Sequence, residues 1–215
     1  NAMPQPPEFD DSFRGRLHDL LVWRRDVRHF RTDTLPPSTV EDLIAEAALS
    51  PSVGHSQPWR FVTVDDPSRR AAVREDFLAC NREALDDYEG ERAKLYASLK
   101  LAGLDDAPVQ MAVFVDNTTQ SGHGVGCKTM PEALPYSVVM AVHTLWLAGR
   151  ARSVGLGWVS ILNPKKIEAI LDVPESWSLV AYLCIGYPLE EHNVPELERH
   201  GWQDRDPQAS ALLKR

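Results

Sequence analysis

The chain has 215 residues, of which 43% are hydrophobic and 25% are charged, and its formal net charge at pH 7 is −8. These values are typical of one soluble globular domain with a sizeable core, or of one subunit of an intimate oligomer. Because the charge is negative and no long basic stretch interrupts the sequence, nucleic acid and anionic membranes are poor partners. A small anionic ligand held by a few local arginines fits this composition.

The three cysteines, Cys80, Cys127 and Cys184, are far apart, odd in number and without a CxxC pair. This usage indicates reduced thiols, so we expect a cytoplasmic protein and no disulfide framework. His123 lies near Cys127, but no third or fourth ligand follows at a zinc-like spacing, so we expect no metal site. The longest apolar stretch, VVMAVHTLWLAG, is too short to span a bilayer.

The first fifty residues are predicted to contain two helices. Residues 10–22 place four large apolar side chains on one helical face behind an aspartate cap. Residues 38–49 predict a second helix, in which Ser38 and Glu41 form a capping box in front of an apolar stripe.

A strand and a long charged segment follow. Residues 59–64, WRFVTV, are rich enough in β-branched and aromatic side chains to form a strand. Asp66 and Pro67 are a typical cap and first residue of a helix. Residues 82–103 are charged and are predicted to be helical as far as Gly103.

The second half of the chain is predicted to contain three strands and two helices. The strands are expected at 109–116, 157–162 and 179–188, with a short helix at 164–171. The helix expected at 131–153 is the longest, and its middle is apolar nearly all round. Such a helix needs cover on every side, from its own domain or from a second subunit. The polar tail after the last strand has little local drive to fold.

The order of these elements indicates the fold class. Helices and strands are mixed, but they lack the strict β-α-β alternation of a doubly wound sheet. We therefore expect an α+β fold, with a sheet flanked by helices, in a single domain over residues 4–215.

The stretch WRRDVRHF, residues 23–30, puts one carboxylate, Asp26, among Arg24, Arg25 and Arg28. Arginines one and four residues apart at a helix end can face the same way and fork onto a phosphate. On composition alone, a solvated basic helix end that complements the helix dipole is an equally good interpretation.

Two other polar stretches have a local interpretation. SPSVGHSQPWRF, residues 50–61, is a loop in which amides and hydroxyls can contact a polar ring edge, unless it is a plain helix-to-strand connection. GHGVG, residues 122–126, fails the GxGxxG spacing because Cys127 occupies the place of the third glycine. We expect a turn there and not a phosphate cradle.

The motifs RRDVRHF, SPSVGHSQPWRF and GLGWVSIL, in this order, resemble those of the nitroreductase-like flavoproteins. The resemblance is stronger to one branch of that superfamily, the 5,6-dimethylbenzimidazole synthases. Four features are similar to that branch: Asp26 within the arginine motif, and the stretches TMPEALPYSVVMAVHTLWLAGRA, GWVSILNP and VAYLCIGYP. The resemblance extends over almost the whole chain.

The resemblance implies a central, mostly antiparallel sheet and an intertwined homodimer that binds FMN at its interface. It also implies that FMN is the substrate. Reduced FMN would react with molecular oxygen and be fragmented to erythrose 4-phosphate and 5,6-dimethylbenzimidazole, the lower ligand of vitamin B12. A separate flavin reductase would supply the reduced FMN. The alternative is an NAD(P)H-dependent nitroreductase or flavin reductase that keeps FMN as its cofactor.

The resemblance further implies two catalytic residues. Asp26 would be the base for cleavage of the ribityl chain, and the neighbouring arginines would keep it ionised. Ser160, on the strand at 157–162, would donate a hydrogen bond to the reactive ring nitrogen. The alternative roles are structural: Asp26 would align the arginines, and Ser160 would bond to a neighbouring carbonyl.

The remaining implied contacts surround the flavin. Residues 82–106 would form a lid that excludes water. Residues 189–215 would form a C-terminal extension from which Arg205 reaches the phosphate. The implied FMN-binding residues are Arg24, Arg25, Asp26, Val27, Arg28, Ser52, Leu104, Ser160 and Arg205.

Overall fold

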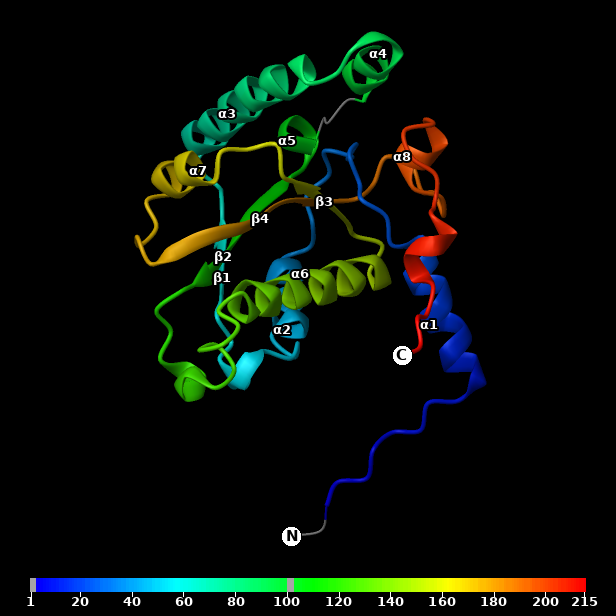
Figure 1. The fold of residues 1–215 in the computed structure, drawn as a ribbon, viewed down its shortest axis with the longest axis vertical. Coiled ribbons are helices and arrows are strands. Elements are labelled where there is room, and N and C mark those ends of the chain that lie inside the picture. Colours follow the sequence, from blue (N-terminus) through cyan, green and yellow to red (C-terminus); the bar gives the residue numbers. More distant parts are fainter. Residues whose placement is uncertain (1–2, 100–102) are drawn as a thin grey trace.

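The structure, a computed structural model, describes residues 3–99 and 103–215, and in this part of the chain four strands form one sheet (Figure 1). Every neighbouring pair is antiparallel, and the order across the sheet is β1-β2-β4-β3. The strands are β1 (Trp59–Thr63), β2 (Val109–Asp116), β3 (Gly155–Val159) and β4 (Trp177–Gly186). The predicted α+β fold with an antiparallel sheet is confirmed.

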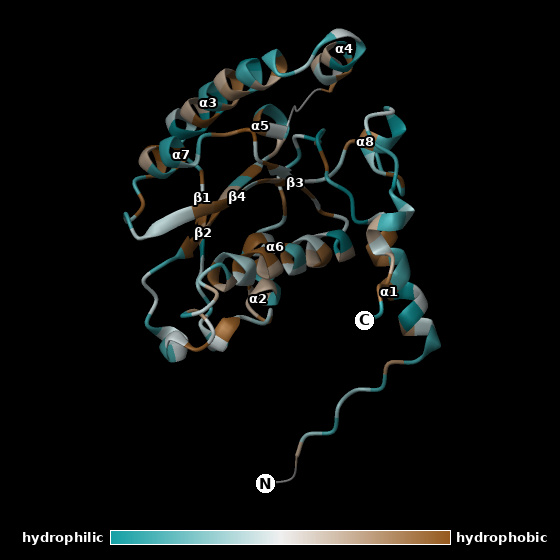
Figure 2. Ribbon diagram, in the orientation of Figure 1, coloured by the Kyte–Doolittle hydropathy of each residue, from teal (hydrophilic) through white to brown (hydrophobic). Residues whose placement is uncertain are grey.

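Helices cover both faces of this sheet (Figure 1). Helices α2 and α6 pack on one face, and α3, α5 and α7 pack on the other. The central strand β2 serves both layers, because its side chains alternate between the two apolar clusters. Figure 2 shows the hydrophobic residues concentrated on the strands. The helices are α1 (Asp11–Trp23), α2 (Thr39–Ala47), α3 (Pro67–Asp86), α4 (Gly90–Ser98), α5 (Gly103–Asp106), α6 (Ala133–Ala151), α7 (Pro164–Leu171) and α8 (Glu196–Arg199).

The helix starts show where local sequence signals held. Asp10 and Asp66 each accept a hydrogen bond from a backbone N–H of the helix that follows, as predicted. The capping box at α2 was wrong. Ser38 has a φ of 68°, in the left-handed region, and its side chain makes no capping hydrogen bond.

The charged segment 82–103 was also predicted wrongly as one helix. Helix α3 ends at Asp86, and α4 begins at Gly90, which has a φ of 58°. Gly103 starts the short helix α5 and does not end a preceding helix. Residues 100–102, part of the predicted lid, lie outside the described residues.

Helix α6 is covered on one side only by its own chain. It has 19 residues, so α3, with 20, is longer, contrary to prediction. Its inward side chains are buried, but Tyr136, Val139 and Met140 are 57%, 40% and 40% exposed. Helix α1 has no fully buried side chain, although Leu20 and Val22 are half-buried. The outer faces of both helices are therefore available to a second subunit.

The described helices give no sign of a membrane crossing. Across residues 3–99 and 103–215, no helix combines the length and apolarity that a bilayer span requires.

Candidate functional site

The arginine motif extends the edge of the sheet. After α1, Asp26 forms a parallel bridge with Leu156 on the edge strand β3, and the Val27 N–H donates to the Leu156 carbonyl at 2.9 Å. Gly157 makes this approach feasible, because a Cβ there would overlap the Val27 carbonyl oxygen. The motifs RRDVR and GLGW are therefore parts of one structure, although about 130 residues separate them.

Asp26 is fixed by two contacts from different parts of the chain. Its Oδ1 accepts a hydrogen bond from the Trp158 N–H at 2.9 Å, and its Oδ2 lies 3.5 Å from Arg28 Nε. The carboxylate lies in a recess, with 39% of the side chain still exposed. The backbone bond from Trp158 fixes its orientation, because β3 is itself held in the sheet.

The pKa of Asp26 is raised above its ordinary value, and burial is the main cause. The Trp158 N–H and Arg28 oppose this rise, while the carboxylate of Glu196 adds to it. The sequence predicted that the neighbouring arginines would have the main effect on the pKa of Asp26, but burial has a larger effect and raises it. A raised pKa suits a base, because it strengthens the affinity of the carboxylate for a proton.

Arg24 and Arg25 lie at the end of α1 against α6. The Arg24 guanidinium lies 4.9 Å from the ring centre of Trp146, whose Nε1 donates to the Arg25 carbonyl at 3.1 Å. Burial lowers the pKa of both arginines, and the positive charge of Arg205 lowers each further. The tail residue Arg205 therefore shares one electrostatic environment with both. This cationic cluster suits a phosphate.

Arg28 has a buried donor without an acceptor. Its side chain is 17% exposed, and its Nε has no hydrogen-bond partner within the described residues. Asp26 and Glu196 lie at ion-pair distances of 3.5 and 3.9 Å from this nitrogen. Buried donors are normally satisfied, so the arrangement suits a ligand that carries a hydrogen-bond acceptor. The pyrimidine edge of a flavin has such acceptors, and the residues therefore fit FMN.

Asp26 and Ser160 share one cavity of about 190 Å³. Ser160 is exposed and lies one residue beyond the end of β3. The prediction that it lies on the strand was wrong. The cavity is smaller than the roughly 300–1,000 Å³ of typical small-molecule sites. It is lined by Asp26, Arg28, Phe77, Asn81, Tyr96, Leu99, Trp158, Val159, Ser160, Ile161, Leu197 and Trp202.

Ser52 lies elsewhere in the same chain. Its Oγ accepts a hydrogen bond from the Gln57 N–H at 3.0 Å, and the adjacent Val53 N–H donates to Ser137 Oγ at 3.0 Å. Ser137 lies nine residues before Trp146 on α6, which corresponds to about 13 Å along a helix axis. Within one chain, the Ser52 loop is therefore remote from the arginine motif.

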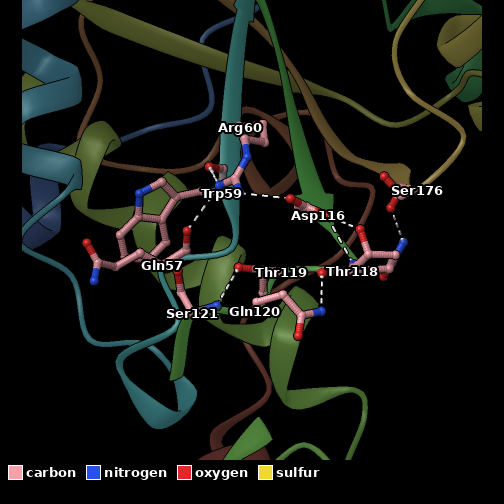
Figure 3. A network of polar contacts seen from close by, with 10 residues as sticks. Gln57, Trp59, Arg60, Asp116, Thr118, Thr119, Gln120, Ser121 and Ser176 are labelled. Carbon is pink, nitrogen blue, oxygen red and sulfur yellow. Dashed lines mark hydrogen bonds and ion pairs between the residues drawn. The ribbon is translucent and has the colours of Figure 1, made fainter. Parts of the chain in front are cut away.

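A polar network holds the end of this loop against the sheet (Figure 3). Arg60 pairs with Asp116 at 2.8 Å and donates to the carbonyl of Gln57 at 3.2 Å. Asp116 also accepts hydrogen bonds from the backbone and side chain of Thr118, each at 3.0 Å. The loop is thus held in place by its own chain, away from Asp26.

Two other predicted contacts have different environments. Leu104 is 7% exposed and belongs to the apolar cluster under α3, and its carbonyl accepts a hydrogen bond from Gln110. It does not line the cavity that contains Asp26 and Ser160. Val27 packs against Gly155 and lines a neighbouring cavity together with Arg25 and Arg28. The role of Leu104 as a flavin contact remains a prediction.

Comparison with known proteins identifies the family of this chain. Residues 21–187 match the Nitroreductase family. The chain belongs to the nitroreductase family. It is 59% identical over 201 residues to the 5,6-dimethylbenzimidazole synthase of Rhodospirillum rubrum, covering 94% of this chain and 95% of that protein. A protein of the same name from Rhodobacter capsulatus is 47% identical over 199 residues, with coverage of 93% and 96%.

Solved structures support the nitroreductase fold. A BluB-like flavoprotein from Clostridium difficile 630 has a TM-score of 0.68 at 20% identity, covering 92% of this chain and 99% of that one. An oxidised iodotyrosine deiodinase bound to FMN and 3-iodo-L-tyrosine has a TM-score of 0.67 at 22% identity, with coverage of 92% and 97%. At this identity, the likeness concerns the fold alone.

The sequence did not reveal every residue of this nitroreductase site. Trp158 was correctly predicted as a strand residue, but the hydrogen bond from its N–H to Asp26 was not predicted. Glu196 and Trp202 belong to a tail that was expected to have little structure, yet they reach Arg28 and the cavity. The two glycines of GLGW could have indicated the contact at Trp158, because glycines in a strand often mark the close approach of another backbone segment. No local signal marked Glu196.

Proposed function

We propose that the protein fragments reduced FMN, with molecular oxygen, to 5,6-dimethylbenzimidazole and erythrose 4-phosphate, with the remainder of the pyrimidine ring released as a further product. The single observation that carries this proposal is the Asp26 carboxylate, held by the Trp158 N–H in the cavity that also contains Ser160. The two relatives at 59% and 47% identity, both named 5,6-dimethylbenzimidazole synthase, support the same activity.

The substrate would be held by its two polar ends. Arg24, Arg25 and Arg205 would bind the phosphate, since each lies in the same cationic cluster. Arg28 would donate its unsatisfied Nε–H to the pyrimidine edge. Between these ends, the ribityl chain would pass Asp26, whose Oδ2 lies 3.5 Å from Arg28 Nε.

Asp26 would accept a proton during cleavage of the ribityl chain. Its raised pKa makes it a stronger base than an ordinary aspartate, and the Trp158 N–H fixes its direction. Ser160 would donate a hydrogen bond to the flavin from its exposed position at the end of β3. Reduced FMN supplies the electrons that activate oxygen.

A homodimer would complete the site. The exposed outer face of α6 and the unburied α1 provide an apolar surface for the second subunit. The partner would then bring a Ser52 loop to the half-site that one chain leaves incomplete. Light scattering should give a dimer at micromolar concentration, and a monomer that still binds FMN would contradict this arrangement. A separate flavin reductase would supply the reduced substrate.

The alternative, an NAD(P)H-dependent nitroreductase or flavin reductase, is not favoured. Such an enzyme does no chemistry on the ribityl chain, so it has no use for a base at Asp26. The relatives with high identity are also named as synthases and not as reductases.

The experiment that separates the two activities uses FMN as the only organic substrate. The protein is mixed anaerobically with chemically reduced FMN, exposed to air, and its products are separated by chromatography. We expect 5,6-dimethylbenzimidazole and a matching loss of FMN. Complete recovery of oxidised FMN, together with NAD(P)H-driven reduction of a nitro compound, would establish the reductase activity.

A further inference from the structure

The C-terminal segment contacts the predicted lid through an aromatic cluster. Trp202 lies 5.3 Å from the ring of Tyr88 and 6.1 Å from the ring of Tyr96. The Arg92 guanidinium lies 4.8 Å from the centre of the Trp202 ring, and its Nη1 donates to the Trp202 carbonyl at 3.0 Å. The tail is therefore bonded to α4 by ring packing, a cation–π contact and a hydrogen bond.

This aromatic cluster forms one wall of the candidate site. Tyr96 and Trp202 both line the cavity that contains Asp26 and Ser160. Tyr96 also donates from its hydroxyl to Asn81 Oδ1 at 2.8 Å, which links α4 to α3 on the same wall. The position of Trp202 thus helps to determine whether α4 stays over the cavity.

The same tail segment carries the predicted phosphate contact. Arg205 follows Trp202 by three residues, and its charge acts on both Arg24 and Arg25. After α8, the C-terminal segment runs back beside α1 (Figure 1). Asp26 and Glu198 offset part of the positive charge on this cluster.

Like charges in such a cluster repel one another unless an anion lies between them. A phosphate would remove this repulsion and stabilise the tail near α1. Because Trp202 and Arg205 are so close in sequence, the same event would hold Trp202 against Tyr88, Arg92 and Tyr96.

We infer that Trp202 is a positioning residue that couples recognition of the substrate phosphate to closure of α4 over the ring cavity. This inference rests on the proposed function, because it takes FMN as the ligand. Its consequence concerns specificity. FMN would be bound and enclosed, whereas riboflavin, which has the same ring but no phosphate, would be bound without enclosure.

Hydrogen exchange of the α4 amides tests the inference without relying on catalysis. The parent protein is measured alone, with oxidised FMN and with riboflavin, each flavin at a concentration that saturates its site. We expect FMN to slow exchange in residues 90–98 by about tenfold, and riboflavin to leave it nearly unchanged.

Variants locate the coupling. Trp202→Ala should still bind FMN, whereas Arg205→Gln should bind it more weakly because a phosphate contact is lost. At saturating FMN, neither variant should show protection of α4. Trp202→Phe keeps an aromatic ring and should restore most of the protection. Arg92→Gln removes the cation–π contact on the α4 side and leaves Trp202 in place. It should also abolish the protection of α4, and it replaces Trp202→Ala as the test if Trp202→Ala folds poorly. Lys214→Ala, which removes a tail charge outside the cluster, is the matched control and should behave like the parent.

The outcomes separate this inference from the proposed function. Equal protection by FMN and riboflavin, or full protection by FMN in a folded Trp202→Ala variant, would overturn the coupling and leave the reaction untouched. Failure of the parent protein to bind FMN in a fluorescence titration would overturn both. Protection that depends on the phosphate, on Arg205 and on an aromatic residue at position 202 would support the coupling.

Discussion

Residues 24–28 and residues 52–58 are both polar segments that follow a helix, and both were predicted to contact the same flavin. The first is built into the sheet beside β3 and contacts α6 at Trp146. The second contacts α6 at Ser137 and is fixed by Arg60 and Asp116 (Figure 3). Within one chain, the two segments therefore contact α6 at different places and lie apart from each other.

The comparison also separates two kinds of polar network. Around the Ser52 loop, the carboxylate of Asp116 is satisfied by Arg60 and Thr118, which is a structural arrangement. Around the arginine motif, Arg28 keeps a buried donor without a partner, and burial raises the pKa of Asp26. Unsatisfied polar groups of this kind are costly to stability and are typical of functional sites.

The largest effect is expected for Asp26→Asn. Asparagine can still accept the Trp158 N–H but cannot take up a proton, so ribityl cleavage should fall by about 10²–10⁴-fold while FMN binding changes little. Product analysis after air exposure should show oxidised FMN and peroxide in place of 5,6-dimethylbenzimidazole. If binding weakens and the bound flavin is still fragmented, Asp26 only aligns the arginines.

Removal of the phosphate contacts should give the next largest effect. Arg24→Ala and Arg25→Ala should each weaken FMN binding by about 1.5–3 kcal/mol, because a charge-assisted hydrogen bond is lost. Riboflavin should bind less tightly than FMN to the parent and be nearly indifferent to both changes. Titrations that show equal losses for the two ligands would exclude contact with the phosphate.

Gly157→Ala should disturb the first region at its junction with β3. The new methyl group would overlap the Val27 carbonyl, so we expect a loss of about 1–3 kcal/mol of unfolding free energy and weaker FMN binding. Gly15→Ala on α1 is the control, since nothing lies within 4 Å of a Cβ there. That variant should be slightly stabilised by its helix propensity. Urea unfolding compares them, and equal stabilities would refute the close approach.

In the proposed homodimer, Arg60→Ala should affect the second region and, through it, the half-site of the partner subunit. Loss of the pair with Asp116 should loosen the loop and weaken FMN binding by about 1 kcal/mol. A mixed dimer would pair one Arg60→Ala subunit with one Asp26→Asn subunit. If each site takes Asp26 from one subunit and the loop from the other, one of its two sites would carry neither change. Below saturating FMN, the mixed dimers should form more product than the mean of the Arg60→Ala homodimer and the Asp26→Asn homodimer. A yield equal to that mean would place both segments in the same site of one chain.

The smallest effect is a pH dependence of stability. Because the native pKa of Asp26 is raised by burial, its charged form costs folding free energy once the pH rises past the ordinary value of 3.8. Asp26→Asn should therefore unfold at a higher temperature than the parent near neutral pH. The difference should shrink as the pH falls towards 3.8 and vanish below it. A thermal shift that does not depend on pH would contradict a raised pKa.

Local patterns determined much of the fold. The structure confirms the predicted helix caps at Asp10 and Asp66 and the predicted bounds of β2 and α7. These features depend on residues that are close together in the sequence. The cap at Ser38 failed because the tertiary path of the chain requires a left-handed backbone there. Local propensity is small enough for such long-range packing to override it.

The arginine motif was visible in the sequence, but its surroundings were not. Charge and spacing made an anion site at Arg24, Arg25 and Arg28 one of two equal interpretations, and the resemblance to the flavoproteins favoured it. Only the tertiary structure brings the Trp158 N–H to Asp26 and Trp202 to the cavity wall. It also decides the direction of the Asp26 pKa, because desolvation depends on everything packed around the carboxylate and not on the charges written beside it in the sequence.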